Sequence, residues 1–549
     1  MANKRGFLNS IVDRSLGWCL GLPSERCDYH VTRAVRIPMR DGINLVGDLY
    51  EPLLPLGAKS APVLLTQGCY GRGFIMALIN ARFFASRNYT VLLVSTRGTF
   101  GSEGDFEPFR TEQRDGQDIV EWMRRQTWYP GSFATCGASY LGYAQWALLH
   151  DPPADCVGAC IPVGPHNYAI HHWGTGSFRL DRVGWGDMVA LQDSSSLRFL
   201  PPTSRLDSDE IFAKSTFMAL PLGDSIKRHL DGRAPWVSDA MAHPDPNDPY
   251  WEPLQHDEAL ERINIPVFLI SGWYDTFTEQ TLQQYTRLRD RDCIVYLTIG
   301  PWVHKRASGV LSMPAIMKFL DHHVSSAQTT HNAPLVRIFV TGAEEWRSLP
   351  SWPPPTQECT FYLHGDQTID MKERPEDSRS CSFGFNPNDP TPTIGGPLQF
   401  GGGRVDDSEY GTRSDVLVYT SGPLEEDMEV LGKPVVELAH SSDTPFVDVW
   451  IRLSEVDKRG ISHNITEAYR SLDAPRDASE TLHMELRDCA HRFTKGTRIR
   501  IIIAGGSLPQ YARNLGSGES RITGSTTRLA CHTIAHAEGR TKILLPRPT

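Results

Sequence analysis

Short apolar runs alternate with stretches of helical spacing in the first part of the chain. Strand-like runs occupy 33–38, 47–52, 61–68, 89–96 and 132–139. Before the last of them, the segment 111–127 has apolar residues at the spacing of an amphipathic helix. Because strands separated by helices pair in parallel, we expect a doubly wound α/β sheet that opens with a hairpin.

A different texture follows at 161–254, where aromatic, histidine, glycine and proline residues are mixed without a strand period. This texture predicts a helical cap inserted into the α/β domain. Alternation typical of strands returns at 263–273 and 292–302. The α/β domain is therefore expected in two parts, at 31–160 and 255–350.

The last third of the chain consists of short strand-like runs without helices between them. It follows the proline-rich segment 348–357, which is typical of a linker. Regular short strands with turn signals predict a β-sandwich over 356–549, and a jelly roll is the form that we expect. The predicted fold class is thus an α/β domain with an inserted helical cap and a C-terminal all-β domain.

The chain has 549 residues, with 55 Lys and Arg against 65 Asp and Glu, and a formal net charge of −10. This acidic balance leaves no excess of cations for phosphate backbones and argues against nucleic acid as a partner. No apolar run approaches the roughly 18 residues of a membrane span, and no apolar core of a signal peptide is seen near the N-terminus. We therefore expect a cytoplasmic protein with no membrane partner.

Eleven cysteines are scattered without CxxC pairs or matching histidine spacing. An odd number in this arrangement predicts reduced thiols in place of a disulfide framework or a zinc site. Cys136 lies in the strand-like run that leads to the candidate nucleophile described below. It is expected to be a buried thiol.

Several charged residues of the last third have no chemical motif around them. Acids in sandwich turns can hold Ca²⁺, but solvated turn residues are the commoner case. We therefore expect all of them at the surface: Asp406, Asp407, Asp443, Asp448 and Asp457 as turn acids, and Lys433, Arg452 and Arg470 as surface charges.

Ser139 lies in the setting of a nucleophile elbow. The strand-like run ends at the small residues Gly137 and Ala138, and an apolar helical segment starts directly after Ser139. Such a sharp turn holds a hydroxyl clear of the backbone, and the helix start supplies N–H groups near a developing oxyanion. Leu141 departs from the G-x-S-x-G pattern, and a serine that only caps the helix is the alternative interpretation.

A serine hydroxyl needs a base, and the base needs a carboxylate that fixes its tautomer. Asp275 and His304 each follow a strand-like run directly. The chain order Ser, Asp, His and the positions at strand ends are those of the α/β-hydrolase fold. Singly, Asp275 could cap a helix and His304 could be a core histidine. Together with Ser139 they predict a catalytic triad.

The oxyanion of an acyl-transfer intermediate needs at least two donors. The backbone N–H of Tyr140, next to the nucleophile, is the first candidate. Tyr70 follows the strand-like run 61–68, and its phenol is the second candidate. A packed loop aromatic would look the same in the sequence.

With these residues the chain resembles the cocaine esterase and X-Pro dipeptidyl-peptidase family of serine hydrolases, also labelled CocE/NonD. The resemblance rests on RIPMRDGINLVGDLYEP, STRGTFGSEGDF, CGASYLGYAQW, HPDPNDPYW, SGWYDTF, IGPWVH, GPLEEDMEVLGKPVVEL and VDVWIRLSEVD. The family's elbow has Gly at the position of Gly142, so Leu141 fits its pattern. The resemblance implies an α/β-hydrolase domain split by a cap and followed by a jelly roll, with these site residues: Ser139 as nucleophile, His304 as base, Asp275 as acid, and Tyr70 and Tyr140 as oxyanion donors.

The resemblance also implies an aromatic acyl pocket, to which Trp173 and Trp185 of the cap and Phe277 after the acid correspond. The α-amino acid ester hydrolases of the family carry extra carboxylates just beyond the acid, where they hold a substrate ammonium. Here Asp275 is followed by Thr276, Phe277 and Thr278. An uncharged acyl group is therefore expected.

The leading hypothesis is a serine hydrolase that cleaves the carboxylic ester, or an amide, of a small-molecule substrate through an acyl-enzyme. An acyltransferase or a chain-releasing thioesterase of a biosynthetic pathway would use the same triad. A non-catalytic binding protein is a third hypothesis. No cofactor or metal is expected, and a homodimer is a possible assembly.

Overall fold

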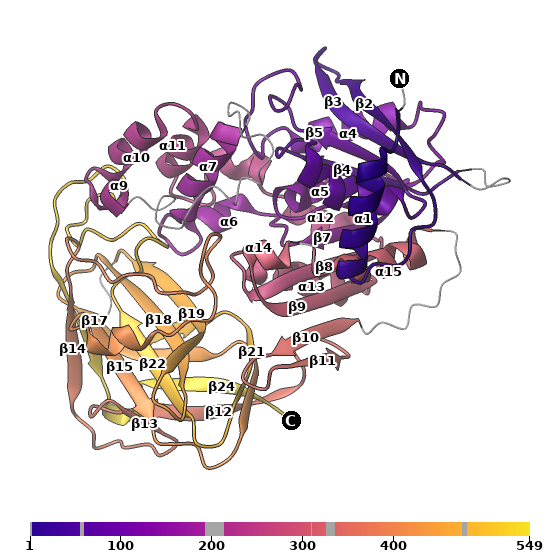
Figure 1. Cartoon of the computed structure of the whole chain (residues 1–549). Helices are drawn as coiled ribbons and strands as arrows, with labels where there is room; N and C mark the ends of the chain where they lie inside the picture. The colour runs from indigo at the N-terminus through magenta and orange to yellow at the C-terminus, as the bar shows by residue number, and fades with distance from the viewer. Residues whose placement is uncertain (1–2, 55–59, 193–213, 309, 326–334, 475–479) are drawn as a thin grey trace.

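The computed structural model describes residues 3–54, 60–192, 214–308, 310–325, 335–474 and 480–549. Figure 1 shows three parts: a sheet with helices around it at the upper right, a group of helices at the upper left, and an all-β part at the lower left. This arrangement confirms the predicted fold class. Residues 193–213 of the predicted cap lie outside the described residues.

The first sheet has eleven described strands in the order β1-β2-β3-β5-β4-β6-β7-β8-β9-β10-β11. Their bounds are β1 (Asn3–Lys4), β2 (Tyr29–Pro38), β3 (Asn44–Pro52), β4 (Val63–Gly68), β5 (Thr90–Ser95), β6 (Phe133–Cys136), β7 (Cys156–Pro162), β8 (Val267–Tyr274), β9 (Val295–Val303), β10 (Val336–Val340) and β11 (Glu345–Leu349). From β5 to β10, neighbours pair in parallel. The edges are antiparallel, and β2 and β3 form the predicted hairpin.

Helices cover both faces of this sheet. One face packs against α4 (Glu112–Met123), α5 (Tyr140–Leu149), α12 (Asp257–Arg262) and α13 (Thr278–Asp290). The other packs against η1 (Leu78–Arg82), α3 (Phe83–Ala85) and α15 (Met313–His323), with α2 (Phe74–Ala77) leading into η1. Alternate strand residues point to opposite faces, so Val63 and Leu65 join one apolar cluster and Leu64 joins the other.

The sequence patterns did not indicate an N-terminal helix, α1 (Phe7–Cys19). Its inner face carries Asp13, which is fully buried and lies 2.5 Å from Arg82 and 2.8 Å from Arg5. These ion pairs tie α1 to the helices on one face of the sheet. Among the described helices, none has both the length and the apolarity that a membrane crossing requires.

The cap lies between β7 and β8 in the chain. Its described helices are α6 (Tyr168–Trp173), α7 (Asp181–Gln192), α9 (Lys214–Met218), α10 (Leu222–Leu230), α11 (Pro235–Ala242) and η3 (Pro249–Leu254). They form the group at the upper left of Figure 1. Their apolar side chains share one cluster with Tyr140, Leu141 and Tyr143 at the start of α5. The cap therefore packs directly on the helix that follows the candidate nucleophile.

The C-terminal part is built of strands and two short 3₁₀ helices. The bounds are β12 (Thr356–Leu363), β13 (Thr368–Asp370), β14 (Ser380–Phe385), η4 (Ser408–Thr412), β15 (Val416–Ser421), β16 (Met428–Gly432), β17 (Val435–Ser442), β18 (Val447–Val456), β19 (Ser462–Leu472), β20 (Leu482–Glu485), β21 (Cys489–Phe493), β22 (Arg498–Ala504), β23 (Ala530–Ala535), η5 (Ala537–Gly539) and β24 (Lys542–Pro548). Most of the strands form one path, β14-β23-β17-β24-β12-β13-β15-β22-β18-β19, around one large and one smaller apolar cluster. We call this part the β domain.

The prediction of surface charge is wrong for Asp407, Asp448 and Arg452, which are at most 1% exposed. Asp448 and Arg452 belong to β18, which is buried over all ten residues, so its polar positions also face the interior. Asp407 packs against the same strand, where it accepts a hydrogen bond from Ser454 Oγ (2.7 Å). Arg452 is paired there with Glu467 at 2.5 Å. The cysteine prediction is confirmed: all eleven thiols are free, and Cys136 is buried.

Candidate active site

Ser139 occupies the turn between β6 and α5. Its backbone has φ +60° and ψ −119°, a combination that L side chains rarely adopt. Its N–H donates to the carbonyl of Pro162 at the end of β7 (3.0 Å), which holds the turn against the sheet. Strain of this kind costs about 1–3 kcal/mol and persists only where the surroundings enforce it. The fold therefore stabilises an unfavourable conformation at this serine.

Glycines let α5 approach the sheet closely at this turn. A Cβ on Gly142 would lie 2.7 Å from the Cα of Gly164, and a Cβ on Gly137 would lie 2.6 Å from the Cβ of Leu141. Real Cβ atoms do not tolerate such contacts with backbone or with a constrained neighbour. A larger residue at either glycine would displace α5 and, with it, Ser139.

His304 and Asp275 lie beside Ser139 at the ends of two neighbouring parallel strands. Asp275 directly follows β8, and His304 directly follows β9, where it begins α14 (His304–Ala307). Ser139 Oγ lies 3.0 Å from His304 Nε2, and His304 Nδ1 lies 2.6 Å from Asp275 Oδ1. Asp275 is fully buried, whereas Ser139 is half-buried. A chain of hydrogen-bond distances thus runs from a buried carboxylate to an accessible hydroxyl.

The orientation of Asp275 is held from two further sides. Its Oδ2 accepts a hydrogen bond from Ser271 Oγ (2.8 Å), and its N–H donates to the Gly272 carbonyl (2.9 Å). A carboxylate that is fixed in this way favours the imidazole tautomer with a proton on Nδ1. Nε2 of His304 is then an acceptor for the Ser139 proton.

An arginine from the β domain holds the backbone of the same loop. Arg487 donates from Nη1 to the Asp275 carbonyl and from Nη2 to the Thr276 carbonyl, both at 3.1 Å. Its Nε donates to Glu279 in α13 (2.8 Å). No local motif in the sequence indicates this role of Arg487, because its partner is 212 positions away in the chain.

The first N–H group of α5 is placed to act as a donor. Among the described backbone groups, no carbonyl accepts from the Tyr140 N–H. The first N–H groups of a helix lack intrahelical partners and lie at the positive end of the helix dipole. The Tyr140 N–H directly follows Ser139 in the chain, so it suits an oxyanion that develops at this serine.

Tyr70 lies in the loop after β4, where its hydroxyl accepts a hydrogen bond from Trp185 Nε1 (3.0 Å). This contact leaves the hydroxyl's own proton for another acceptor. Burial raises the pKa of Tyr70 well above its ordinary value, so the phenol stays protonated. Its ring packs edge-on against Tyr140, with centroids 6.2 Å apart. A protonated phenol is thus held next to the residue that follows Ser139.

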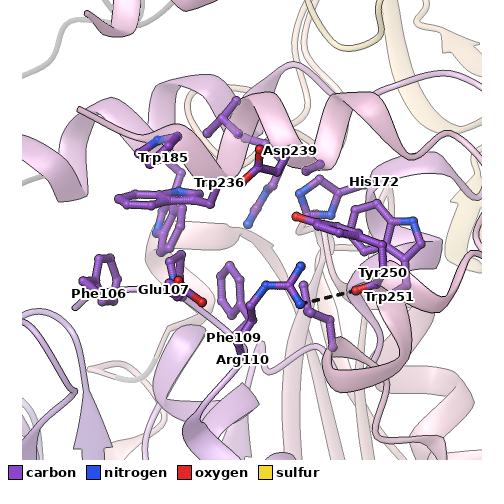
Figure 2. A pocket seen from close by; sticks show the side chains of 16 residues that line it. Phe106, Glu107, Phe109, Arg110, His172, Trp185, Trp236, Asp239, Tyr250 and Trp251 are labelled. Atoms are coloured by element: carbon purple, nitrogen blue, oxygen red, sulfur yellow. Dashed lines mark hydrogen bonds between the residues drawn. The ribbon is translucent and has the colours of Figure 1, made fainter. Parts of the chain in front are cut away.

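The three aromatic residues assigned to the acyl pocket have different surroundings. Trp185 lines a cavity of about 150 Å³ between the cap and the loop 106–110 (Figure 2). Phe277 packs edge-on against the ring of His304, with centroids 5.4 Å apart. Trp173 instead donates from its indole to a backbone carbonyl of α11 and is 3% exposed. Trp185 therefore lies next to Tyr70, and Phe277 lies next to His304. Trp173 instead stabilises the cap.

In the described part of the chain, no group of three or more His, Cys, Asp or Glu side chains is placed to hold a metal ion. His172 faces the backbone of its own helix, with Nδ1 2.7 Å from the Tyr168 carbonyl. Burial lowers the pKa of His172 to about 3, so this histidine is neutral. Its ring packs against Phe178 and Trp251 and belongs to the interior of the cap.

Two family models match the chain. Residues 41–306 match the model of the X-Pro dipeptidyl-peptidase family S15, and residues 329–545 match that of the X-Pro dipeptidyl-peptidase C-terminal non-catalytic domain. The first range contains Ser139, Asp275 and His304. The second range contains the β domain as far as Leu545 in β24, together with β10 and β11 of the first sheet.

Proteins with similar sequences are named as esterases. The chain is 28% identical over 544 aligned residues to a cocaine esterase from Rhodococcus sp. (strain MB1 Bresler), with 89% of this chain and 93% of that protein covered. It is 26% identical over 600 aligned residues to a putative serine esterase from Mycobacterium bovis, with the same coverage of both proteins. The similarity thus extends over nearly the full length of each protein.

Solved structures show the same fold at lower identity. An aminopeptidase from a marine sediment archaeon, Thaumarchaeota archaeon, has a TM-score of 0.82 and 19% identity, with 96% of this chain and 98% of the other covered. An α-amino acid ester hydrolase has a TM-score of 0.80 with the same identity and coverage. A CocE/NonD family hydrolase from Staphylococcus aureus has a TM-score of 0.67 and 14% identity, with 95% and 94% covered. Taken with the two family models and the esterase relatives, this shows that the chain belongs to the cocaine esterase and X-Pro dipeptidyl-peptidase (CocE/NonD) family of serine hydrolases.

Proposed function

We propose that this chain is a serine esterase that cleaves a carboxylic ester through an acyl-enzyme on Ser139. The observation that carries the proposal is the chain of distances from Asp275 through His304 to Ser139 Oγ, 2.6 Å and 3.0 Å long. A buried carboxylate, a histidine and an accessible serine hydroxyl in this order are the parts of an activated nucleophile. The esterases among the relatives support the same reaction class.

In the first half-reaction, Ser139 Oγ attacks the ester carbonyl while His304 Nε2 takes the hydroxyl proton. Asp275 stabilises the imidazolium that forms. The Tyr140 N–H and the Tyr70 hydroxyl donate to the oxyanion of the tetrahedral intermediate. When the intermediate collapses, His304 returns the proton to the departing alcohol, and the acyl group stays on Ser139.

In the second half-reaction, His304 takes a proton from water, and the hydroxide attacks the acyl-enzyme carbonyl. The same two donors hold the second oxyanion. When it collapses, the bond to Ser139 Oγ breaks, His304 returns the proton to this oxygen, and the carboxylic acid is released. An uncharged acyl group suits the aromatic surroundings of Trp185 and Phe277. No carboxylate follows Asp275 within three residues to bind a substrate ammonium.

Replacing Ser139 with Ala tests the proposal directly. We expect kcat for 4-nitrophenyl butyrate to fall about 10⁴- to 10⁶-fold, because the nucleophile is lost. The variant should also lose labelling by a fluorophosphonate probe. The matched control is Ser382→Ala, which removes an exposed serine of the β domain and should keep both properties. Full turnover by a folded Ser139→Ala protein would exclude the proposed nucleophile.

The acyl acceptor is tested in the same assay. An esterase releases the free acid even when alcohols are added, because water is its acceptor. If the acyl group instead passes mainly to an added alcohol or thiol at low concentration, the proposal of hydrolysis is wrong and acyl transfer by the same triad is the activity.

A further inference from the structure

A buried arginine lies at the inner side of the cavity in the cap. Arg182, in the first turn of α7, is 3% exposed and lines the same cavity as Trp185. Figure 2 shows the other walls, where Phe109, Trp185 and Trp236 enclose an apolar space. An arginine is rarely buried without a partner, because moving an unpaired charge out of water is costly.

The hydrogen bonds of Arg182 are incomplete. Nη2 donates to Oε1 of Gln399, which comes from the β domain (2.5 Å). Nε is buried and has no acceptor in the described part of the chain. The nearest carboxylate, Asp181, lies 3.7 Å from Nε, which is beyond hydrogen-bond distance. Gln399 is neutral, and the ion pair with Asp181 has no hydrogen bond, so it compensates the positive charge of Arg182 incompletely.

Asp181 is shared between Arg182 and other groups. Its Oδ1 lies 3.7 Å from Arg182 Nε and has no hydrogen-bond partner among the described residues. Its Oδ2 accepts from Arg179 (3.3 Å) and from Thr276 Oγ1 (3.4 Å). His171 lies 3.9 Å away, and burial lowers its pKa well below the ordinary value, so it is neutral. This buried cluster therefore contains two guanidinium groups and one carboxylate, and its net charge is +1.

Arg182 lies near one aromatic residue of the cavity and one aromatic residue of the loop after Asp275. Its guanidinium carbon lies 5.7 Å from the ring centroid of Trp185 and 5.6 Å from that of Phe277. Trp185 donates to Tyr70, and Phe277 packs against His304. A substrate whose ester is at Ser139 would therefore extend along these two aromatic rings toward the guanidinium.

We propose that Arg182 binds a carboxylate of the substrate, so that this chain prefers esters that carry a second, anionic group. The inference rests on the proposed function, because it names a specificity residue of the same site. A carboxylate would accept from the unsatisfied Nε and neutralise the excess charge of the cluster. Arginine presents N–H donors in a planar fork that matches the two oxygens of a carboxylate.

The charges at the mouth of the cavity do not replace this interaction. Glu107 and Asp239 line the mouth and are exposed, and solvent screens them. Arg110 is half-buried and lies over the ring of Tyr250, 4.3 Å from its centroid. Of the charged residues that line this cavity, Arg182 is the one cation that is buried against the aromatic walls.

The carboxylate could belong to the acyl group or to the alcohol. If the carboxylate belongs to the alcohol, the expectation of an uncharged acyl group holds. If it belongs to the acyl group, that expectation is wrong. Two matched pairs of substrates separate the sources. The acyl pair is 4-nitrophenyl hemiadipate and the corresponding monoamide. The alcohol pair is the butyrate ester of 4-hydroxyphenylacetic acid and that of 4-hydroxyphenylacetamide.

For the wild-type enzyme we expect kcat/KM to be about 10- to 100-fold higher for the acid than for the amide in one of the two pairs, as for a hydrogen bond to a charged group. The pair that shows the preference identifies the source of the carboxylate. Equal values in both pairs, or a preference for the amide in both, would overturn the proposal without any variant.

Arg182→Gln should lower the acid-to-amide ratio by about 10- to 100-fold, and Arg182→Lys should retain part of it. Arg233→Gln is the matched control, since Arg233 pairs with Asp187 elsewhere in the cap. An unchanged ratio in Arg182→Gln, or loss of the preference in Arg110→Gln alone, would assign the preference to another residue and overturn the proposal. If Arg182→Gln does not fold, the wild-type ratios and Arg182→Lys still decide.

The failure of this inference can be distinguished from failure of the proposed function. If wild-type enzyme cleaves the neutral amide esters and depends on Ser139 but shows no preference for the acids, only the role of Arg182 is wrong. If the enzyme cleaves none of the four esters and resists fluorophosphonate labelling, the esterase assignment itself fails.

Discussion

Two buried acids, one in each large domain, have opposite surroundings. Glu112 in α4 and Asp448 in β18 are both completely buried. Asp448 accepts hydrogen bonds from Arg521 on both oxygens, at 2.9 Å and 3.1 Å. Glu112 accepts from the hydroxyl of Tyr140 and from the Thr111 N–H, and no cation is among its described partners.

The pKa values of the two acids move apart for this reason. Burial raises the pKa of Glu112 to about 7, because its neutral hydrogen-bond partners offset little of the desolvation. Burial acts on Asp448 as well, but the charge and hydrogen bonds of Arg521 outweigh it and lower the pKa. The β domain thus contains a buried ion pair in which the two charges compensate each other. The hydrolase domain instead contains Glu112, a readily protonated acid that contacts Tyr140, the residue after Ser139.

The largest expected effect is in the β domain. Arg521→Met should lower the free energy of unfolding by about 3–5 kcal/mol, because it leaves the Asp448 carboxylate buried without its partner. Arg521 also donates to the Ala512 carbonyl and to Ser471 Oγ, so the variant loses loop contacts as well. Urea unfolding at pH 7 measures the change.

Arg528→Met is the control for that measurement. Arg528 forms an exposed pair with Asp443, with the two side chains about half exposed. Exposed pairs contribute about 0–1 kcal/mol. Similar losses of stability in both variants would show that burial of Asp448 does not decide the effect.

Glu112→Gln tests the hydrolase side of the comparison. The unfolded chain ionises a glutamate near pH 4.3, whereas the folded chain ionises Glu112 near pH 7. Between these values the folded state binds more protons, so its stability falls as pH rises and then levels off above pH 7. Between pH 4.5 and pH 8, the free energy of unfolding of wild type should fall by about 3 kcal/mol relative to that of Glu112→Gln.

Denaturant unfolding at five or six pH values gives this difference. Glu121→Gln, at an exposed position of the same helix, is the control and should follow the wild-type curve. If the free energy of unfolding of Glu112→Gln follows the same pH dependence as that of wild type over the whole range, Glu112 is ionised in the folded protein. The difference in protonation between Glu112 and Asp448 would then not exist.

A smaller effect is expected where the β domain contacts the site. Arg487→Met should lower kcat about 10- to 100-fold with little change in KM, because it frees the backbone of the loop that carries Asp275. Arg487→Lys keeps a charge for Glu279 but cannot bridge both carbonyls, so an intermediate kcat is expected. Steady-state kinetics on 4-nitrophenyl butyrate separates the two constants.

Arg470→Met removes an exposed arginine of the same domain and should leave both constants unchanged. A change in KM alone for Arg487→Met, or an equal change in the control, would mean that Arg487 does not position the acid loop. The β domain would then stabilise the protein without acting on the triad.

The sequence predicted the hydrolase sheet and its chemistry because their signals are local. An elbow such as that at Ser139 requires small residues within a few positions, and Asp275 and His304 directly follow apolar strands. The parallel order of these strands then brings the three side chains together. Local spacing was therefore sufficient to predict the fold class and to propose the triad residues.

Other features could not be predicted because they depend on contacts between distant segments. The partners of Arg487 and Gln399 lie in other domains, and no period in the sequence marks them. No chemical motif surrounds Arg452, so the sequence predicts a surface charge, but the strand that carries it is buried on both sides. Short-range patterns also do not reveal which aromatic residues, such as Trp173, only pack within the cap.

The bridge from Arg487 to the two carbonyls beside Asp275 has a consequence for protein engineering. The hydrolase domain of this chain is not an independent module, because part of its acid loop is held by the neighbouring domain. A chimera that joins this hydrolase domain to the β domain of a relative should therefore carry an arginine at the equivalent position. Without it, we expect a correctly folded hybrid in which Asp275 is poorly aligned with His304.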